Sequence, residues 1–166
     1  MKTLLLLRHG KSSWDDPSLR DFDRPLARRG KRDAPLMGEA LSKRGPIPDY
    51  VLCSTARRAR STVKAFIKGA GLETEPQFEQ GIYEASSSEL MKIARRLPDA
   101  SACVLMVGHN PGFEEMVSRL TGSFESMPTA ALACIELDIE RWEDVDDGRG
   151  KLAWLLTPKQ LGGGDD

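Results

Sequence analysis

The two histidines of the chain and several of its arginines stand in three short stretches, each directly after an apolar segment. The stretches are LRHGKS at residues 7–12, CSTARR at residues 53–58 and VGHNPG at residues 107–112. Arginine presents a planar fork of donors that matches phosphate oxygens, and a neutral imidazole can attack phosphorus and carry the phosphoryl group. Together these residue types indicate phosphoryl-transfer chemistry.

Phosphoryl transfer needs mainly positioning and neutralisation of charge. Arg8 and one arginine of the Arg57/Arg58 pair would hold a phosphoryl group from two sides. One histidine would act as the nucleophile, and the second, protonated, would stabilise charge on the equatorial oxygens.

Simpler interpretations of the same residues exist. An Arg-His pair after a strand is often structural, Arg57 and Arg60 fit the solvated face of a helix, and His109 could be a turn residue bonded to backbone. A metal site is disfavoured because the carboxylate and cysteine partners expected of one are missing near both histidines. No glycine-rich P-loop is present in the sequence. The joint placement at three strand ends favours a phosphate site.

Apolar runs and helix breakers predict the elements that position these stretches. The expected strands cover residues 3–7, 50–53, 73–78, 103–107, 130–137 and 151–155, and the expected helices cover 28–43, 56–69 and 87–96, with a further helix after Pro111. Ser54 or Thr55 would cap the second helix, Ser86 or Ser87 the third, and Pro111 would take the first position of the fourth. Residues 14–24 read as a loop.

Alternating strands and helices predict a three-layer α/β/α sandwich with a mostly parallel central sheet. In such a sheet the carboxyl ends of the parallel strands meet at one edge, where ligands bind and helix N-termini favour anions. We expect one domain over residues 1–160 and a disordered tail over residues 161–166.

The composition is that of an ordinary globular protein, with a formal net charge of −1. This argues against nucleic-acid or membrane-surface partners, which usually require a basic excess. Cys53, Cys103 and Cys134 are expected to be reduced core residues of a cytoplasmic protein. The apolar run before Arg8 is too short for a signal peptide, and no other stretch is long enough to span a membrane.

Motifs in a fixed order carry a resemblance to a known family. Arg8-His9-Gly10, the stretch from Ser54 to Thr62 and the stretch from Val107 to Gly112 resemble the signatures of the histidine phosphatase superfamily, which has the phosphoglycerate mutase-like fold. Further stretches are similar to those of its SixA-like phosphohistidine phosphatase branch, namely KSSW at 11–14, DRPL at 23–26 with RG at 29–30, IYEA at 82–85 and MPTA at 127–130.

The resemblance implies a role for each matching residue. His9 would be the nucleophile that becomes phosphohistidine, and Arg8 and Arg58 would bind the phosphoryl oxygens. Arg58 is preferred to Arg57 because it directly precedes Ala59, as in the family pattern. His109 would complete the phosphate pocket and stabilise the transition state. Ser12 and Asp15 fall where some members of the family place auxiliary polar contacts.

The chain departs from the family pattern at the proton donor. Asn110, not an acid, follows His109, which leaves Glu84 as the nearest candidate, although Glu84 could equally brace its loop. A phosphoryl group on nitrogen needs less help from a general acid than a phosphate ester does. A chain this short also has little room for a cap, and an open pocket suits a protein substrate.

The function predicted from the sequence is therefore a metal-independent phosphatase that needs no cofactor. Its expected substrate is phosphohistidine in a protein, for example in a histidine phosphotransfer domain. The alternatives are a small-molecule phosphomonoesterase of broad specificity and a non-catalytic phosphate- or phosphopeptide-binding module.

Overall fold

The computed structural model describes residues 1–162. The described strands are β1 (Lys2–Arg8), β2 (Tyr50–Cys53), β3 (Gln77–Phe78), β4 (Cys103–Gly108), β5 (Leu132–Leu137) and β6 (Gly150–Leu156), and the α-helices are α1 (Arg28–Arg44), α2 (Arg57–Ala70), α3 (Ser87–Arg95) and α4 (Gly112–Thr121). Residues 163–166, most of the predicted disordered tail, lie outside the described residues. Leu161, which that tail included, instead ends a short 3-10 helix and packs against the core.

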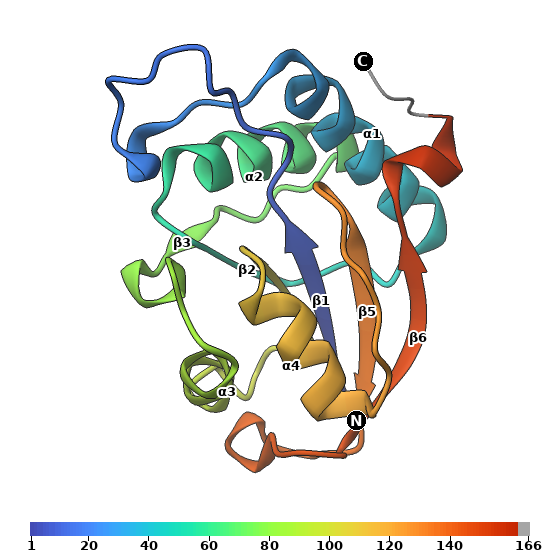
Figure 1. The fold of residues 1–166 in the computed structure, drawn as a ribbon. Coiled ribbons are helices and arrows are strands. Elements are labelled where there is room, and N and C mark those ends of the chain that lie inside the picture. Colours follow the sequence, from blue (N-terminus) through green and yellow to red (C-terminus); the bar gives the residue numbers. More distant parts are fainter. Residues whose placement is uncertain (163–166) are drawn as a thin grey trace.

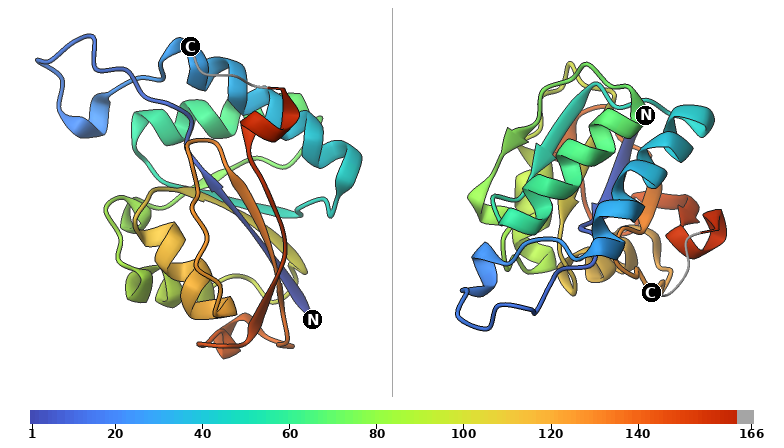
Figure 2. Two further views of the ribbon diagram at one scale, coloured as in Figure 1. Left: turned by 45° about the vertical axis from the view of Figure 1, so that its right-hand side comes forward. Right: turned by 90° about the horizontal axis from the view of Figure 1, so that it is seen from above.

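The strands form a single sheet in the order β3-β2-β4-β1-β5-β6. The four strands from β3 to β1 run parallel, whereas β5 is antiparallel to β1 and β6 is antiparallel to β5. Helices α1 and α2 cover one face and α3 and α4 the other (Figures 1 and 2). The fold is thus the predicted three-layer α/β/α sandwich of the phosphoglycerate mutase-like class.

Alternation along β1 explains why both faces of the sheet must be covered. Leu4 and Leu6 lie in the core cluster under α3 and α4, and Leu5 and Leu7 lie in the cluster under α1 and α2. All four are fully buried. A strand with apolar side chains on both faces is stable only between two helical layers, which is the position of β1. The three cysteines are buried and unpaired, as predicted.

Two strands are shorter than the sequence predicts. The third reduces to Gln77–Phe78, an exposed edge segment that pairs only with β2, and Pro76 before it lacks an amide donor. The fifth begins at Leu132 because Ala130 has a positive φ of 64°, outside the extended region.

The helix starts also differ in detail. The N-cap of α2 is Ala56 without a side-chain bond, not Ser54 or Thr55, and Pro111 stands one position before α4 instead of inside it. The predicted cap of α3 is confirmed, because Ser86 and Glu89 form a reciprocal capping box.

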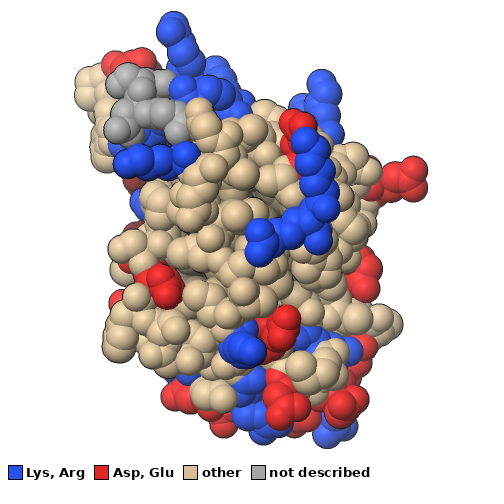
Figure 3. All heavy atoms as spheres, turned by 90° about the vertical axis from the view of Figure 1, so that its right-hand side faces the viewer, with Lys and Arg blue, Asp and Glu red and all other residues tan. Residues whose placement is uncertain are grey.

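The other edge of the sheet is β6. Its side chains from Leu152 to Leu156 are only partly covered, and the middle of the face on this side of the molecule carries few charged groups (Figure 3).

Register brings the carboxyl ends of the central strands level with one another. Arg8 of β1 pairs with Gly108 of β4, and Cys53 of β2 pairs with Val107 of β4. The residues that follow these three strands, His9, Ser54 and His109, therefore stand side by side at one edge. The loop after β1 reaches from there to the N-terminal end of α2 (Figure 1).

Candidate active site

His9 is fixed by its backbone and by one ring nitrogen. Its amide donates to the carbonyl of Gly108 at 3.0 Å, and its carbonyl accepts from Ala130 at 2.9 Å. The ring Nδ1 lies 2.7 Å from the carbonyl oxygen of Gly10. A carbonyl only accepts, so Nδ1 carries the proton and Nε2 keeps its lone pair.

The electrostatic surroundings keep His9 neutral. Burial lowers its pKa to about 3; the bond to Gly10 opposes this effect, and the positive charges of Arg58 and Arg8 add to it. Neutral imidazole is the form that can attack phosphorus. The tautomer and the charge state of His9 therefore both suit a nucleophile acting through Nε2.

Two glycines allow the loop after β1 to lie against α1. A Cβ on Gly10 would meet the Cα of Gly30 at 2.9 Å, closer than side-chain carbons approach. The amide of Gly10 also donates to Thr62 Oγ1 of α2 at 3.0 Å. The histidine loop is thus held between the two helices that cover one face of the sheet.

Arg58 extends from the first turn of α2 toward His9. Its Nε lies 3.4 Å from His9 Nε2, and its side chain is 9% exposed. Its two Nη groups donate to the carbonyl and to the carboxylate of Asp21, at 2.8 and 3.0 Å. Asp21 therefore supplies the countercharge that a buried guanidinium requires and fixes where its fork points.

Asp21 is itself held in the ionised form. Partial burial would raise its pKa, but the hydroxyl of Tyr83, which donates at 2.6 Å, and the guanidinium of Arg58 lower it to about 2. Arg24 binds the other carboxylate oxygen at 3.2 Å. An ionised carboxylate with these partners positions Arg58 and is not a proton donor.

His109 faces His9 across 5.2 Å between ring centroids. Its Nε2 lies 2.7 Å from Ser54 Oγ, and its buried Nδ1 has no hydrogen-bond partner among the described residues. Nε2 is the acceptor within reach of the Ser54 hydroxyl proton, which favours the tautomer with the proton on Nδ1. Nδ1–H is then a buried donor available to a ligand.

The charge state of His109 differs from the sequence expectation. Burial and the charge of Arg58 lower its pKa to about 4, against an opposing effect of Asp21, so the ring is neutral at pH 7 rather than protonated. A dianionic phosphoryl group between the two arginines would raise this pKa, because it adds negative charge beside the ring.

Arg8 comes from the end of β1, and its positive charge lowers the pKa of both histidines. Its Nη1 donates to the carbonyl of Met127 at 2.9 Å, while its buried Nε has no partner among the described residues. Burial lowers its pKa and Arg58 lowers it further, although Glu114 opposes this. Two desolvated guanidiniums near one neutral histidine form a strongly anion-attracting pocket.

Of the other residues that the sequence singled out, some lie on the surface and one is connected to the site. Arg57 and Arg60 are exposed, as the solvated-face interpretation predicted. The hydroxyl oxygen of Ser12 accepts from Arg24 at 2.6 Å, so Ser12 joins the site through Arg24 and Asp21. Asp15 is exposed in the loop and is not among the residues that line the cleft described next.

An open cleft of about 570 Å³ is lined by Arg58 and His109, whereas His9 and Arg8 lie behind these two residues and are not in its lining. Its lining brings together the loop after β1, the first turn of α2, the segment before α3 and the start of α4. Glu84 lies in this lining with an exposed side chain and a positive φ of 57°, an unusual backbone conformation for a non-glycine residue. Glu84 therefore lines the same cleft as Arg58 and His109.

Sequence reasoning gave Asp21 and Tyr83 no role in the site, and it gave Ser54 only the role of a helix cap. Asp21 acts on Arg58 across 37 positions and Tyr83 acts on Asp21 across 62. One usable signal was present: a buried arginine in a phosphate site needs a carboxylate partner, and the loop before Arg24 is rich in aspartate.

Among residues 1–162 there is no cluster of three or more His, Cys, Asp or Glu side chains arranged to hold a metal ion. Within the same residues, no helix is both long and apolar enough to cross a membrane.

Residues 4–99, more than half of the chain, match the sequence profile of the histidine phosphatase superfamily, branch 1. The chain belongs to this superfamily. An uncharacterised chloroplastic protein of Arabidopsis thaliana is 34% identical over 166 residues, covering 93% of this chain and 75% of the relative. Histidine phosphatase superfamily membership and the fold together make the chain an enzyme with phosphatase activity.

Solved structures of the histidine phosphatase superfamily match over nearly the whole chain. A candidate phosphohistidine phosphatase SixA of Nakamurella multipartitia superposes with a TM-score of 0.84 at 25% identity, covering 95% of this chain and 96% of the other. A second candidate SixA, from Agrobacterium tumefaciens, gives a TM-score of 0.81 at 28% identity, covering 95% and 98%. Within its superfamily the chain is therefore SixA-like.

Proposed function

We propose that the chain removes phosphoryl groups through a covalent phosphohistidine on His9, and that its substrate is phosphohistidine in a protein. One observation carries the proposal. The unprotonated Nε2 of His9 lies 3.4 Å from Arg58 Nε, beside a second imidazole whose Nδ1 has no partner among the described residues. This arrangement supports the proposal, because a nucleophile and donors for phosphoryl oxygens would then share one pocket.

The reaction has two displacements at phosphorus. In the first, the Nε2 lone pair of His9 forms the N–P bond while the bond from phosphorus to the leaving imidazole breaks. The leaving ring keeps that electron pair and departs neutral, because its other nitrogen already carries a proton. In the second, a water oxygen attacks phosphorus, the bond to Nε2 breaks, and inorganic phosphate is released.

Each charged neighbour would have a distinct task in both steps. Arg8 and Arg58 would neutralise the phosphoryl oxygens from two sides, and His109 would donate from Nδ1 to a third oxygen. Asp21 would hold the Arg58 guanidinium in place through its carbonyl and its carboxylate. Ser54 would hold His109 in the donating tautomer.

Proton supply favours a nitrogen leaving group over an oxygen one. Asp21, with a pKa of about 2, is ionised and cannot donate. Glu89 is engaged in the capping box of α3. The SixA names of the solved relatives agree with a phosphohistidine substrate.

A second candidate function rests on Glu84. Its exposed carboxyl lies in the cleft lining and would protonate the oxygen of a phosphate ester if the chain hydrolyses small phosphomonoesters.

A trapping experiment with matched variants tests the proposal. A protein carrying ³²P-phosphohistidine is mixed with the chain and quenched, and we expect acid-labile label on the wild type and none on His9→Ala. Glu84→Gln should lower kcat/KM for sugar phosphates, whose alkoxide leaving groups need a proton, more than for phosphohistidine. Absence of label on the wild type contradicts the proposed intermediate, and higher kcat/KM for a sugar phosphate than for phosphohistidine contradicts the proposed substrate.

A further inference from the structure

The charges that line the cleft are unevenly distributed. Arg58 is its only lysine or arginine among the described residues, and Arg58 is already paired with Asp21 at 3.0 Å. The other charged lining residues are Glu84, Glu89 and Glu115. The end of the cleft away from Arg58 therefore carries a net negative charge.

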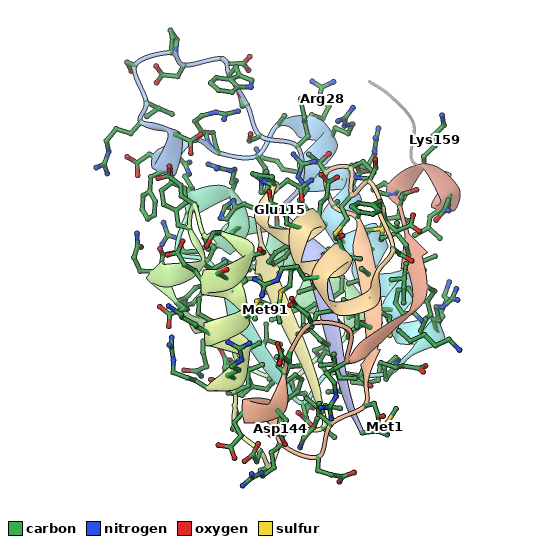
Figure 4. The ribbon with its side chains drawn as sticks, turned by 60° about the horizontal axis from the view of Figure 1, so that its bottom comes forward. Met1, Arg28, Met91, Glu115, Asp144 and Lys159 are labelled. Carbon is green, nitrogen blue, oxygen red and sulfur yellow. The ribbon has the colours of Figure 1, made fainter. Side chains whose placement is uncertain are left out.

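A second hollow continues this acidic end along α4. It has a volume of about 530 Å³, and Glu115 lines both it and the cleft. Glu115 lies near the N-terminal end of α4 (Figure 4). The lining of the second hollow includes Glu125 and Phe124, and the ring of Phe124 is 91% exposed. We call the surface formed by Glu84, Glu115, Glu125 and Phe124 the acidic groove.

Arg119 is the arginine that lines the second hollow among the described residues, and its guanidinium is bound to residues outside the acidic groove. The Nε of Arg119 binds Asp147 at 2.9 Å, and its Nη1 donates to Ser88 at 3.0 Å. Glu114, which also lines this hollow, accepts a hydrogen bond from the amide of Met127 at 2.7 Å. Its negative charge acts on Arg8 and raises the pKa of that guanidinium. The charges of Glu115 and Glu125 remain available to a ligand.

The buried Nδ1 of His109 marks the end of the cleft at which a phosphoryl group would bind. His109 is 8% exposed, lines the cleft, and its Nδ1 has no partner among the described residues. Glu84 and Glu115 line the same cleft, so the rest of a substrate whose phosphoryl group is bound at His109 can reach them through it.

We propose that the acidic groove binds a basic segment of the phosphorylated polypeptide, with lysine or arginine beside the phosphorylated residue and an apolar side chain against Phe124. This inference rests on the proposed function and names its substrate class. Opposite charge attracts such a segment during encounter and binding. Substrates with additional phosphate or carboxylate groups on the leaving-group side are repelled.

Two phosphohistidine peptides that differ only in flanking residues, four lysines or four glutamates, test the selectivity. We expect kcat/KM to be about tenfold or more higher for the lysine peptide at low salt, and the difference to shrink at 0.5 M NaCl as exposed charges are screened. Glu115→Lys should reduce the preference about three- to tenfold.

Glu73→Lys is the matched control. It makes the same change in net charge at an exposed position just beyond the C-terminal end of α2, about 20 Å from the end that carries Arg58. We expect it to leave the preference unchanged. Equal rates for both peptides, or equal effects of the two substitutions, would overturn the inference.

A small-substrate pair separates this inference from the proposed function. If neither peptide is dephosphorylated, the proposed function fails, and the charge preference is decided by O-phosphoethanolamine against 3-phosphoglycerate. Faster hydrolysis of the cationic ester, reduced by Glu115→Lys, supports the acidic groove. Faster or equal hydrolysis of the anionic ester, or no hydrolysis of either, overturns it.

Discussion

Ser54→Ala tests whether one buried hydroxyl sets the protonation of the catalytic pocket. The Ser54 side chain is fully buried, and its oxygen lies 2.7 Å from His109 Nε2 and 3.3 Å from the amide of Ala56. Removing it leaves Nε2 without a partner in a ring whose Nδ1 already has none. An unpaired buried polar group costs about 1–3 kcal/mol, so we expect the free energy of unfolding to fall by about that amount.

The effect on catalysis follows from the tautomer. Without the hydroxyl, the His109 proton is free to move to Nε2, which removes the donor that would face the phosphoryl group. Complete loss of such a donor costs about 100- to 1,000-fold in rate. Because the ring itself remains, we expect kcat/KM to fall about 10- to 100-fold, which equals about 1.4–2.7 kcal/mol of transition-state stabilisation.

The assay compares kcat/KM and urea unfolding of the wild type, Ser54→Ala and Thr55→Ala. Thr55 is the matched control because its hydroxyl binds Gln80 outside the cleft lining. Thr55→Ala should retain wild-type kcat/KM. If Ser54→Ala also retains it while His109→Ala is inactive, then Ser54 does not set the His109 tautomer.

Three further predictions concern charge. Arg58→Ala should lower kcat/KM by roughly 3 kcal/mol of transition-state stabilisation, whereas Asp21→Asn, which only loosens Arg58, should have a smaller effect on the same rate; equal losses would place Asp21 in direct contact with substrate. His9 and His109 have folded-state pKa values of about 3 and 4, below the ordinary 6.5, so the unfolded chain takes up protons first as the pH falls. The free energy of unfolding should therefore decrease as the pH is lowered from about 6.5 toward 4. In a series of thermal melts, the melting temperature of His9→Ala should depend less on pH than that of the wild type. EDTA should leave kcat unchanged, and restoration of a lost rate by added metal would contradict metal independence.

Local sequence patterns predicted many of the strands and helices. The continuous apolar run at residues 3–7 predicted a strand covered on both faces, and β1 is such a strand. The first helix was predicted over residues 28–43 and is observed over Arg28–Arg44. These features depend on interactions between residues close in sequence, whose preferences the chain itself displays.

Predictions from local sequence patterns were wrong where a side chain binds a residue far away in the sequence. Ser54 has the chemistry of an N-cap, but its hydroxyl is bound to His109, 55 positions away, and α2 begins without a side-chain cap. The predicted third strand reduces to Gln77–Phe78, and Pro76 directly before it has no amide proton to donate to a neighbouring strand. His109 was expected to be protonated, but burial, with the nearby charge of Arg58, lowers its pKa to about 4 and leaves the free ring neutral at pH 7.

The types and order of Arg8, His9, Arg58 and His109 were enough to indicate phosphoryl transfer and to predict these residues as its site. Their protonation states and their supporting contacts follow from the tertiary structure alone. The neutral His9, the ionised Asp21 and the Ser54–His109 bond all depend on burial and on contacts between segments far apart in the chain. Desolvation and charge pairing are properties of positions in space, which the order of residues does not display.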